Sequence, residues 1–286
     1  MRTRRVTVAK ACSTGAQFVG VILLGWLSWQ LLRWTVVDAV FVADAQACQA
    51  LGREAACWGV VTEKARPLLL GMPGQWGGLP LTLLLFVSSW CLSWPLGIAL
   101  ALARRSRRAW LSGPATVFIE AVRGVPLVGL LFSAAFLLPL VWPIGEAPAL
   151  GWRAGLALTL FSAAYLAEIV RGGLQTVPGE QTEAAATLGL SWWGTQRRIV
   201  LPQALRAVLP ALTGHAIGLL KDTSLVMVIG LHELTGGLSL SLGGDPDWRP
   251  FYFEAYLFVG AVYALLCMVL SRMGLHLEQR WQRAQG

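Results

Sequence analysis

The sequence contains few charged residues and few histidines, and it lacks the short motifs of several enzyme classes. Only 13% of its 286 residues are charged. There is no Gly-Lys pair, and therefore no GxxxxGK[ST] phosphate-binding loop. The three histidines, His215, His232 and His276, are scattered, with neither an HExxH motif nor a GxSxG elbow. We therefore expect no ATP hydrolysis by this chain alone and no catalytic site.

Apolar residues dominate the chain instead. They make up 56% of the sequence, fourteen residues are tryptophan, and the mean hydropathy is +0.60. These values exceed those of a soluble globular protein. Because a helix needs about 20 residues to cross ~30 Å of hydrocarbon, we expect spans near residues 16–41, 79–103, 115–142, 153–171, 205–231 and 251–271. The sequence thus predicts an all-α, polytopic membrane protein with about six helices.

The first apolar run is predicted to be a retained helix. A removable signal peptide has a short apolar core followed by a cleavage site with small residues. The run from Phe18 to Leu32 instead continues through the bulky side chains of Trp26, Trp29 and Trp34.

Basic residues in the short loops predict the orientation, because Lys and Arg accumulate on the cytoplasmic side of a membrane. They precede the first span and follow the second at Arg2, Arg4, Arg5, Lys10, Arg104, Arg105, Arg107 and Arg108. We therefore expect both termini and the 172–198 loop on the cytoplasmic side of a bacterial inner membrane. The net charge of +8 is explained by this topology and by anionic lipid, so it does not indicate nucleic-acid binding.

Two of the five cysteines lie in a long loop predicted to face outward. Cys48 and Cys57 fall within residues 43–76, whereas Cys12, Cys91 and Cys267 lie in or next to spans. A periplasmic loop is in an oxidising compartment, which favours a disulfide between Cys48 and Cys57 over two free thiols. Metal binding is disfavoured because the loop contains no histidine.

The chain is predicted to have two parts. Residues 1–77 form a first helix and a charged outward loop without clear periodicity. Residues 78–286 contain five closely spaced spans joined by short loops rich in Pro and Gly. We interpret this second part as one helical membrane domain, with no soluble domain or repeat.

A polar stretch between two apolar regions, residues 176–202, is predicted to form two short helices. Gly189 suits a left-handed C-cap for a helix of about ten residues. Ser191 can cap the next helix, which Pro202 would kink or end. An apolar face of Ala184, Ala185 and Leu188 could then lie in a groove on another protein. The alternative is a connector helix that lies flat on the membrane.

Ionisable residues inside apolar spans form three groups. These are Lys221-Asp222-Thr223-Ser224, Glu120 with Arg123, and Glu168 with Arg171. Such residues face a bundle interior, a partner or a water-filled path, because charge in hydrocarbon is costly. The two Glu–Arg pairs have i, i+3 spacing and could simply pair within their own helices.

The neighbours Lys221 and Asp222 point about 100° apart on a helix, so at least one needs a partner elsewhere. One possibility is an interhelical salt bridge that fixes packing. The other is a substrate such as an amino acid zwitterion. Lys221 would meet its carboxylate, and Asp222, Glu120 or Glu168 its ammonium.

Four stretches carry a resemblance to the polar amino acid permease family of ABC importers. The segment Glu183–Pro202, EAAATLGLSWWGTQRRIVLP, resembles the EAA loop, which holds the coupling helix. The other stretches are EAVRGVPLV from Glu120, AYLAEIVRGGLQTVPGEQTEAA from Ala164, and KDTSLVMVIGLHEL from Lys221. The resemblance covers about residues 80–280. The N-terminal loop, with Cys48 and the stretch ACWGVV, is most similar to one of the paired permease subunits of the general L-amino-acid permease.

This resemblance implies a type I importer. A second homologous permease subunit would complete the pathway, and a periplasmic binding protein would deliver the amino acid. An ATPase dimer, which binds ATP and Mg²⁺, would dock at the coupling helix through Glu183, Ala184, Ala185, Leu188 and Gly189. The chain itself would need no cofactor. ATP binding and hydrolysis would drive alternating access.

Two other functions are compatible with the sequence. An ion-coupled secondary transporter would use Lys221 and Asp222 as its coupling site, although no pair of Gly/Pro-broken helices recurs in the two halves. A membrane assembly scaffold would use its charges only to hold partners.

Overall fold

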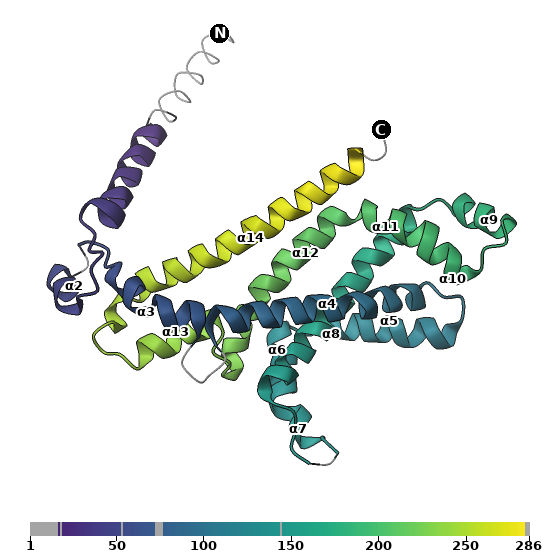
Figure 1. Cartoon of the computed structure of the whole chain (residues 1–286), viewed down its shortest axis with the longest axis horizontal. Coiled ribbons are helices and arrows are strands. Elements are labelled where there is room, and N and C mark those ends of the chain that lie inside the picture. The colour runs from purple at the N-terminus through teal and green to yellow at the C-terminus, as the bar shows by residue number, and fades with distance from the viewer. Residues whose placement is uncertain (1–16, 18, 53, 72–76, 144, 284–286) are drawn as a thin grey trace, which may run out of the picture. The chain divides into compact units, whose positions relative to one another are not determined.

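The computed structural model describes residues 17, 19–52, 54–71, 77–143 and 145–283, and within them it contains helices but no β-strand (Figure 1). Two isolated bridges pair Val40 with Cys57 and Gly78 with Glu233. The all-α prediction is confirmed. Residues outside this description include Arg2, Arg4, Arg5, Lys10 and Cys12, on which parts of the orientation and cysteine predictions depend.

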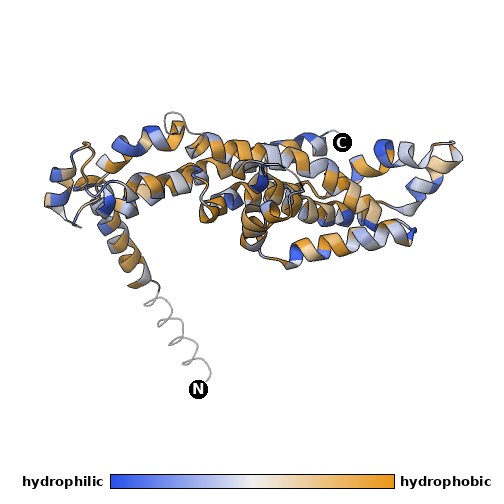
Figure 2. Cartoon of the chain, turned by 90° about the horizontal axis from the view of Figure 1, so that it is seen from below, coloured by the Kyte–Doolittle hydropathy of each residue, from blue (hydrophilic) through white to orange (hydrophobic). Residues whose placement is uncertain are grey.

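Five helices in the described residues are long and apolar enough to cross a membrane, and a bent pair of helices brings the number to six if it counts as one span. The five are Val19–Val37, Gly78–Arg104, Leu150–Thr176, Leu209–Ile229 and Arg249–Trp281. Figure 2 shows hydrophobic residues along most of these helices. Many of their large apolar side chains are exposed in the single chain, as is expected of surfaces that meet lipid or a partner helix.

The predicted third span, 115–142, is not one straight helix. The segments Ala109–Gly124 and Leu127–Val141 meet at an angle of 104°. At the break Val125 is extended, with φ −97° and ψ 133°, and Pro126 follows it. A proline disfavours helical geometry in the preceding residue and lacks an N–H donor of its own. Both effects end the first segment at Gly124.

The chain divides into two compact units, each built from two separate segments of the chain. The first consists of residues 1–65 and 242–258, and the second of residues 66–241 and 259–286. The predicted division at residue 77 separates the chain by position, whereas these units are defined by contacts. The predicted division therefore stays a prediction.

The first unit is held together by a disulfide within its first segment and by polar contacts between its two segments. Its elements are the helix Val19–Val37, which ends in η1 (Arg33–Val37), then α2 (Ala45–Leu51), most of α3 (Gly59–Leu70), the end of α13 (Leu234–Gly243), η5 (Arg249–Phe251) and the start of α14 (Tyr252–Arg283). A disulfide joins Cys48 to Cys57, the pair that the sequence singles out. The buried Glu254 accepts a hydrogen bond from the Cys57 N–H at 3.2 Å. Lys64 and Asp245 form an ion pair at 2.5 Å.

The hydrogen bond from Lys64 holds the pKa of Asp245 below its ordinary value. The ion pair therefore stabilises the 242–258 segment above the unfolded aspartate pKa of about 3.9, and this stabilisation is lost as the pH falls through the lower folded pKa. Because the pair is partly exposed, we expect a contribution of about 1 kcal/mol or less. Hydrogen exchange of the amides of residues 242–250, corrected for intrinsic rates, should show faster local opening at acid pH. Asp245→Asn should remove the part of this pH dependence that the pair causes, and an unchanged profile would contradict the assignment.

The second unit contains the remaining helices and most of the apolar core. They are α4 (Gly78–Arg104), α5 (Ala109–Gly124), α6 (Leu127–Phe132), η2 (Ser133–Leu137), α7 (Leu138–Leu140), α8 (Leu150–Thr176), α9 (Gly179–Thr187), α10 (Trp192–Thr195), η3 (Gln196–Val200), α11 (Leu201–Ala207), α12 (Leu209–Asp222) and η4 (Thr223–Ile229), with most of α13 and α14. Helix α4 packs along α8 (Figure 1).

Two buried apolar clusters lie in this unit. One joins α4, α6, α8 and the α12–η4 segment, and the other joins α4, α5 and α8 to η3 and α11. In the second cluster Val200 and Ala204 are buried with Val170 and Leu174. The segment that follows the short helix α9 is thereby fixed to the membrane helices, which makes α9 an attached but exposed element.

Candidate functional site

The predicted short helix after the fourth span is α9, nine residues long, and it ends in a specific cap. Gly189 has φ +72°, the left-handed conformation that glycine adopts without strain. The N–H of Leu190 donates to the Ala185 carbonyl at 3.1 Å, and the N–H of Gly189 donates to Ala186 at 3.0 Å. These two bonds make a Schellman motif, which satisfies carbonyls at the helix end. Gly189 therefore fixes where α9 stops.

The side chains of α9 do not all lie on an exposed docking face. Glu183, Ala184 and Leu188 are exposed, and Leu188 is 79% exposed. Ala185 is only 1% exposed, because it faces its own chain. Ala184 and Leu188 share one side of the helix at i, i+4 spacing, whereas Ala185 lies about 100° around it. The expected apolar face thus consists of Ala184 and Leu188, and the inclusion of Ala185 was wrong.

The segment after α9 is helical across Pro202. Ser191 caps α10 by accepting a hydrogen bond from the Gly194 N–H at 3.2 Å. The helix does not end at Pro202, because a π-helical turn, η3, leads into α11, with the Leu201 N–H donating to Gln196. Pro202 then lies in the first turn of α11. Proline is tolerated there because first-turn N–H groups have no helical partner.

An ion-pair cluster centred on Glu168 joins α4, α5 and α8. Glu168 pairs with Arg104 at 2.7 Å, Arg171 at 2.9 Å and Arg123 at 3.8 Å. Glu120 pairs with Arg104 at 2.7 Å. The i, i+3 pair Glu168–Arg171 is therefore present, but Glu120 pairs with Arg104 rather than with Arg123. Arg104 is the last residue of α4, and its long side chain pairs with both carboxylates.

Arg123 also touches a belt of aromatic and polar side chains inside the second unit. Its guanidinium lies 5.3 Å from the centre of the Tyr165 ring, which stacks on His215 at 6.1 Å. His215 contacts the Ser162 hydroxyl at 3.0 Å, and Ser162 donates to Ser93 at 3.1 Å. Sequence reasoning missed this belt, which joins one residue each from α4, α5 and α12 to two residues of α8. The signal in the sequence was a polar residue, such as His215, on an otherwise apolar helix.

The Lys221–Ser224 group lies where α12 becomes the 3-10 helix η4. The hydroxyls of Thr223 and Ser224 donate to carbonyls of their own turn, at 2.7 and 2.8 Å. Lys221 is exposed and Asp222 is half-buried. Within the described residues no ion pair involves either one, and none connects them to the Glu168 cluster. The structure thus leaves two opposite charges available at this point of the chain.

Glu233 is a fully buried carboxylate that sequence reasoning also missed. It accepts hydrogen bonds from the Thr82 hydroxyl at 3.1 Å and the Tyr263 hydroxyl at 2.9 Å. It further accepts from the N–H groups of Thr235 and Gly236, each at 2.9 Å. Glu233 therefore caps α13 and links it to α4 and α14.

Comparison with known proteins agrees with this arrangement of long apolar helices and a short polar loop. Residues 93–283 match the family described as "Binding-protein-dependent transport system inner membrane component". The chain belongs to the binding-protein-dependent transport system inner membrane components. As one of these components it has the type I ABC importer transmembrane fold, and the predicted resemblance to amino acid ABC importer permeases is confirmed.

Among its relatives, this inner membrane component is 42% identical over 209 residues to the glutamate/glutamine/aspartate/asparagine transport system permease protein BztC of Rhodobacter capsulatus, covering 73% of this chain and 48% of that one. It is 42% identical over 207 residues to the inner membrane amino-acid ABC transporter permease protein YhdY of Escherichia coli. This match covers 72% of this chain and 56% of YhdY. The chain spans about half the length of these two relatives.

A solved relative extends the comparison to three dimensions. The crystal structure of an amino acid ABC transporter with histidines matches with a TM-score of 0.64 and 31% identity, over 77% of this chain and 97% of that one. The match covers nearly all of the solved chain.

Proposed function

We propose that the chain is a permease subunit of an ATP-driven importer for amino acids. The observation that carries the proposal is the exposed, Schellman-capped helix α9, held on the membrane helices by η3 and α11. A rigid attachment with an exposed surface suits a helix that transmits movement between subunits. The amino acid cargo is supported by relatives whose names specify amino acid transport. Nothing in the described residues favours a gradient-driven transporter or a scaffold.

The proposed complex contains four kinds of partner. A second permease subunit completes the pathway, and a cytoplasmic ATPase dimer, with its ATP and Mg²⁺, docks at α9 through Glu183, Ala184, Leu188 and Gly189. A periplasmic binding protein delivers the amino acid, and lipid surrounds the helices. In this orientation both termini and α9 are cytoplasmic. ATP binding draws the coupling helices together, and the pathway alternates between two populated arrangements.

Within the pathway, the proposed substrate contacts are Lys221 and Asp222. Glu120 and Glu168 were also candidates for the substrate ammonium, but each is already neutralised by arginine. A carboxylate that is paired gains little by exchanging partners. Lys221 is therefore assigned to the substrate carboxylate and Asp222 to the ammonium, with Thr223 and Ser224 shaping the turn.

Lys221→Ala is expected to reduce transport about tenfold or more, because a charge-assisted hydrogen bond to the substrate is lost. Assembly with the partner permease and the ATPase should be retained. Transport is measured as uptake of radiolabelled amino acid, and assembly as the amount of ATPase that co-purifies with the chain. Equal loss of uptake and of assembly would identify Lys221 as a packing residue.

The whole proposal is tested by purifying the complex through this chain. Co-purified subunits are identified, and ATP hydrolysis is measured with the binding protein and single L-amino acids. Stimulation by loaded binding protein supports the importer. Transport that depends on a proton or sodium gradient would establish the secondary transporter, and stable partners without any transport would establish the scaffold.

A further inference from the structure

Four exposed residues form a surface on the segment that returns from α9 to the membrane helices. They are Trp192 and Trp193 of α10 and Arg197 and Arg198 of η3, and we call them the return surface. The two tryptophan side chains are 52% and 68% exposed, and their rings meet edge to face at 4.6 Å. In the part of the chain that the structure describes, no ion pair involves either arginine. The surface therefore presents two aromatic rings and two unpaired cations.

The same segment is fixed to the inner end of the membrane helices by its buried residues. The long apolar helix α8 ends at Thr176, and Val200 of η3 is buried together with Leu174 near that end. A side chain at Gly173 would collide with the Ala204 carbonyl, so α11 packs closely on the last turns of α8. The segment thus meets the helix bundle where the apolar span stops.

This attachment determines the depth of the two arginines. A helix rises about 1.5 Å per residue, so Arg197 and Arg198 lie within about 5 Å of Val200 along the segment. The polar layer on each side of the hydrocarbon is about 5–8 Å thick. The return surface therefore lies at the depth of the lipid headgroups, and it is exposed on the outside of this chain.

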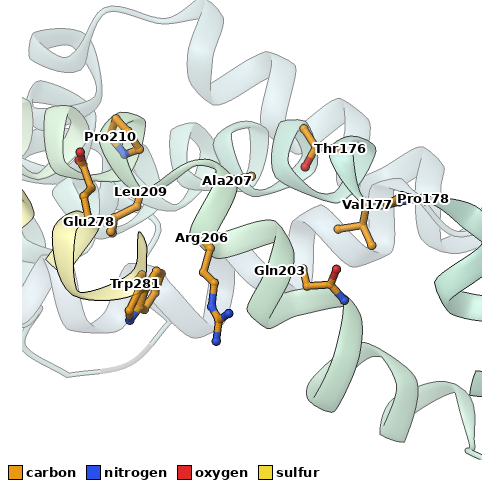
Figure 3. A pocket seen from close by; sticks show the side chains of 10 residues that line it. All are labelled: Thr176, Val177, Pro178, Gln203, Arg206, Ala207, Leu209, Pro210, Glu278 and Trp281. Atoms are coloured by element: carbon orange, nitrogen blue, oxygen red, sulfur yellow. The ribbon is translucent and has the colours of Figure 1, made fainter. Parts of the chain in front are cut away.

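A second arginine and tryptophan lie at the same end of the bundle. The guanidinium of Arg206 lies 5.5 Å from the centre of the Trp281 ring, and both residues line a cavity with Thr176, the last residue of α8. Figure 3 shows the Arg206 side chain beside Trp281 and the Glu278 carboxylate pointing away from it. Tryptophan is enriched at membrane–water interfaces, and arginine extends its charge to the headgroups there. The residue types at this end are thus those of a membrane surface.

The two arms of the coupling segment have opposite charge. Helix α9 carries Glu180 and Glu183, both exposed, and no basic residue, whereas the stretch Trp192–Val200 carries two arginines and no acidic residue. An anionic membrane surface attracts basic residues and repels acidic ones. Because α9 packs against α10 and η3, a membrane that holds the basic arm also determines where the acidic arm points.

We propose that the return surface binds anionic phospholipid at the inner face of the membrane, and that this contact sets the direction in which α9 meets the ATPase. The arginine guanidiniums bind lipid phosphate through paired N–H groups, and the tryptophan rings lie among the headgroups. The acidic helix α9 is directed away from the membrane. This inference rests on the proposed function, because it uses the cytoplasmic position of α9 and its docking to the ATPase.

The occupant of the return surface is identified by photo-crosslinking in the full complex. The complex is placed in nanodiscs of phosphatidylcholine with increasing amounts of phosphatidylglycerol. The photoreactive residue p-benzoylphenylalanine replaces Trp193 or, as the matched control on α9, the exposed Leu188. We expect position 193 to form an adduct with phosphatidylglycerol and position 188 to form one with the ATPase.

Charge variants test whether the lipid contact affects coupling. Hydrolysis stimulated by loaded binding protein should increase with phosphatidylglycerol. The double variant Arg197→Gln, Arg198→Gln should form about tenfold less lipid adduct at position 193, because each basic residue near an anionic surface contributes roughly fivefold in affinity. It should also lose most of the increase in hydrolysis. The double variant Arg280→Gln, Arg283→Gln removes the same charge from the exposed last turn of α14 and should keep both.

The outcomes separate this inference from the proposed function. An adduct of position 193 with the ATPase or with the partner permease would overturn the lipid contact and make the return surface a protein interface. Adduct and hydrolysis that do not respond to phosphatidylglycerol, or that are unchanged in the first double variant, would overturn it too. In these cases an ATPase adduct at position 188 and stimulated hydrolysis still support the importer. Absence of both would overturn the proposed function, and with it the coupling role of the lipid.

Discussion

A Gly189→Asp variant is expected to insert and fold but to lose most of its binding to the ATPase. Gly189 has φ +72° and ends α9 with a Schellman motif. Apart from its neighbours in the chain, no described residue lies within 4 Å of the position that a Cβ would occupy, so the membrane core should not be disturbed. Aspartate tolerates the left-handed backbone better than most residues, so the cost falls mainly on a new negative charge beside Leu188, at the C-terminal end of α9, and is about 1–2 kcal/mol. Pull-down of the ATPase through the permease measures the loss, which should be about tenfold or more.

Two further substitutions separate backbone strain from charge. Gly189→Asn has nearly the shape of aspartate, is neutral and tolerates the left-handed conformation, so it should retain binding. Gly189→Ala adds strain without charge and should fall between the two. Loss of binding in both the Asp and the Asn variant would assign the effect to the cap alone. Normal pull-down of the ATPase with Gly189→Asp would contradict the docking role of α9.

The features that could be predicted from the sequence are those that depend on interactions between residues close together in the chain. The α9 helix, its Gly189 cap and the Ser191 cap each depend on local backbone chemistry, so the residue types alone predict this segment. Most of the spans are predictable because apolar length alone identifies them, but it could not show that the third is broken at Val125 and Pro126. The burial of Ala185 was missed because it depends on how α9 packs against α10 and η3.

The missed features are those that join distant segments. Arg104 indicated orientation in the sequence, yet its side chain reaches back into the helices and binds both Glu120 and Glu168. For Glu120, spacing along one helix could suggest only Arg123 as a partner. Glu233 gave no signal beyond one acidic residue in an apolar stretch, because its partners lie 151 and 30 residues away. Such pairings depend on which helices become neighbours.

The charged residues of the second unit separate into two groups by their partners. Glu168 and Glu233 have their acceptor sites filled by donors of this chain, which is the arrangement that offsets the cost of removing a carboxylate from water. Lys221, Asp222, Arg206 and Glu278 form no ion pair in the residues that the structure describes. The first group therefore holds helices together, and the second group is available for a ligand or for a partner subunit.

Glu233→Ala is the substitution expected to destabilise the permease most. It would leave the hydroxyls of Thr82 and Tyr263 and the first N–H groups of α13 without their acceptor, in a site that is 0% exposed. Each buried donor left without an acceptor costs about 1–3 kcal/mol, so we expect a total of roughly 3–5 kcal/mol, which corresponds to an apparent Tm lower by roughly 10 °C. Thermal unfolding of the purified complex in detergent, at fixed protein and lipid concentrations, measures this shift.

The matched control is Glu233→Gln, which keeps the shape and one acceptor oxygen for the Thr235 and Gly236 N–H groups. Its amide N–H₂ can donate to the Tyr263 oxygen, so most of the stability should remain. Tyr263→Phe removes a single donor and should cost about 1 kcal/mol. If alanine and glutamine at position 233 lower the Tm equally, the negative charge itself stabilises the junction of α4, α13 and α14. If neither lowers it, the carboxylate does not hold these helices together, and its burial then has to be explained by the transport cycle.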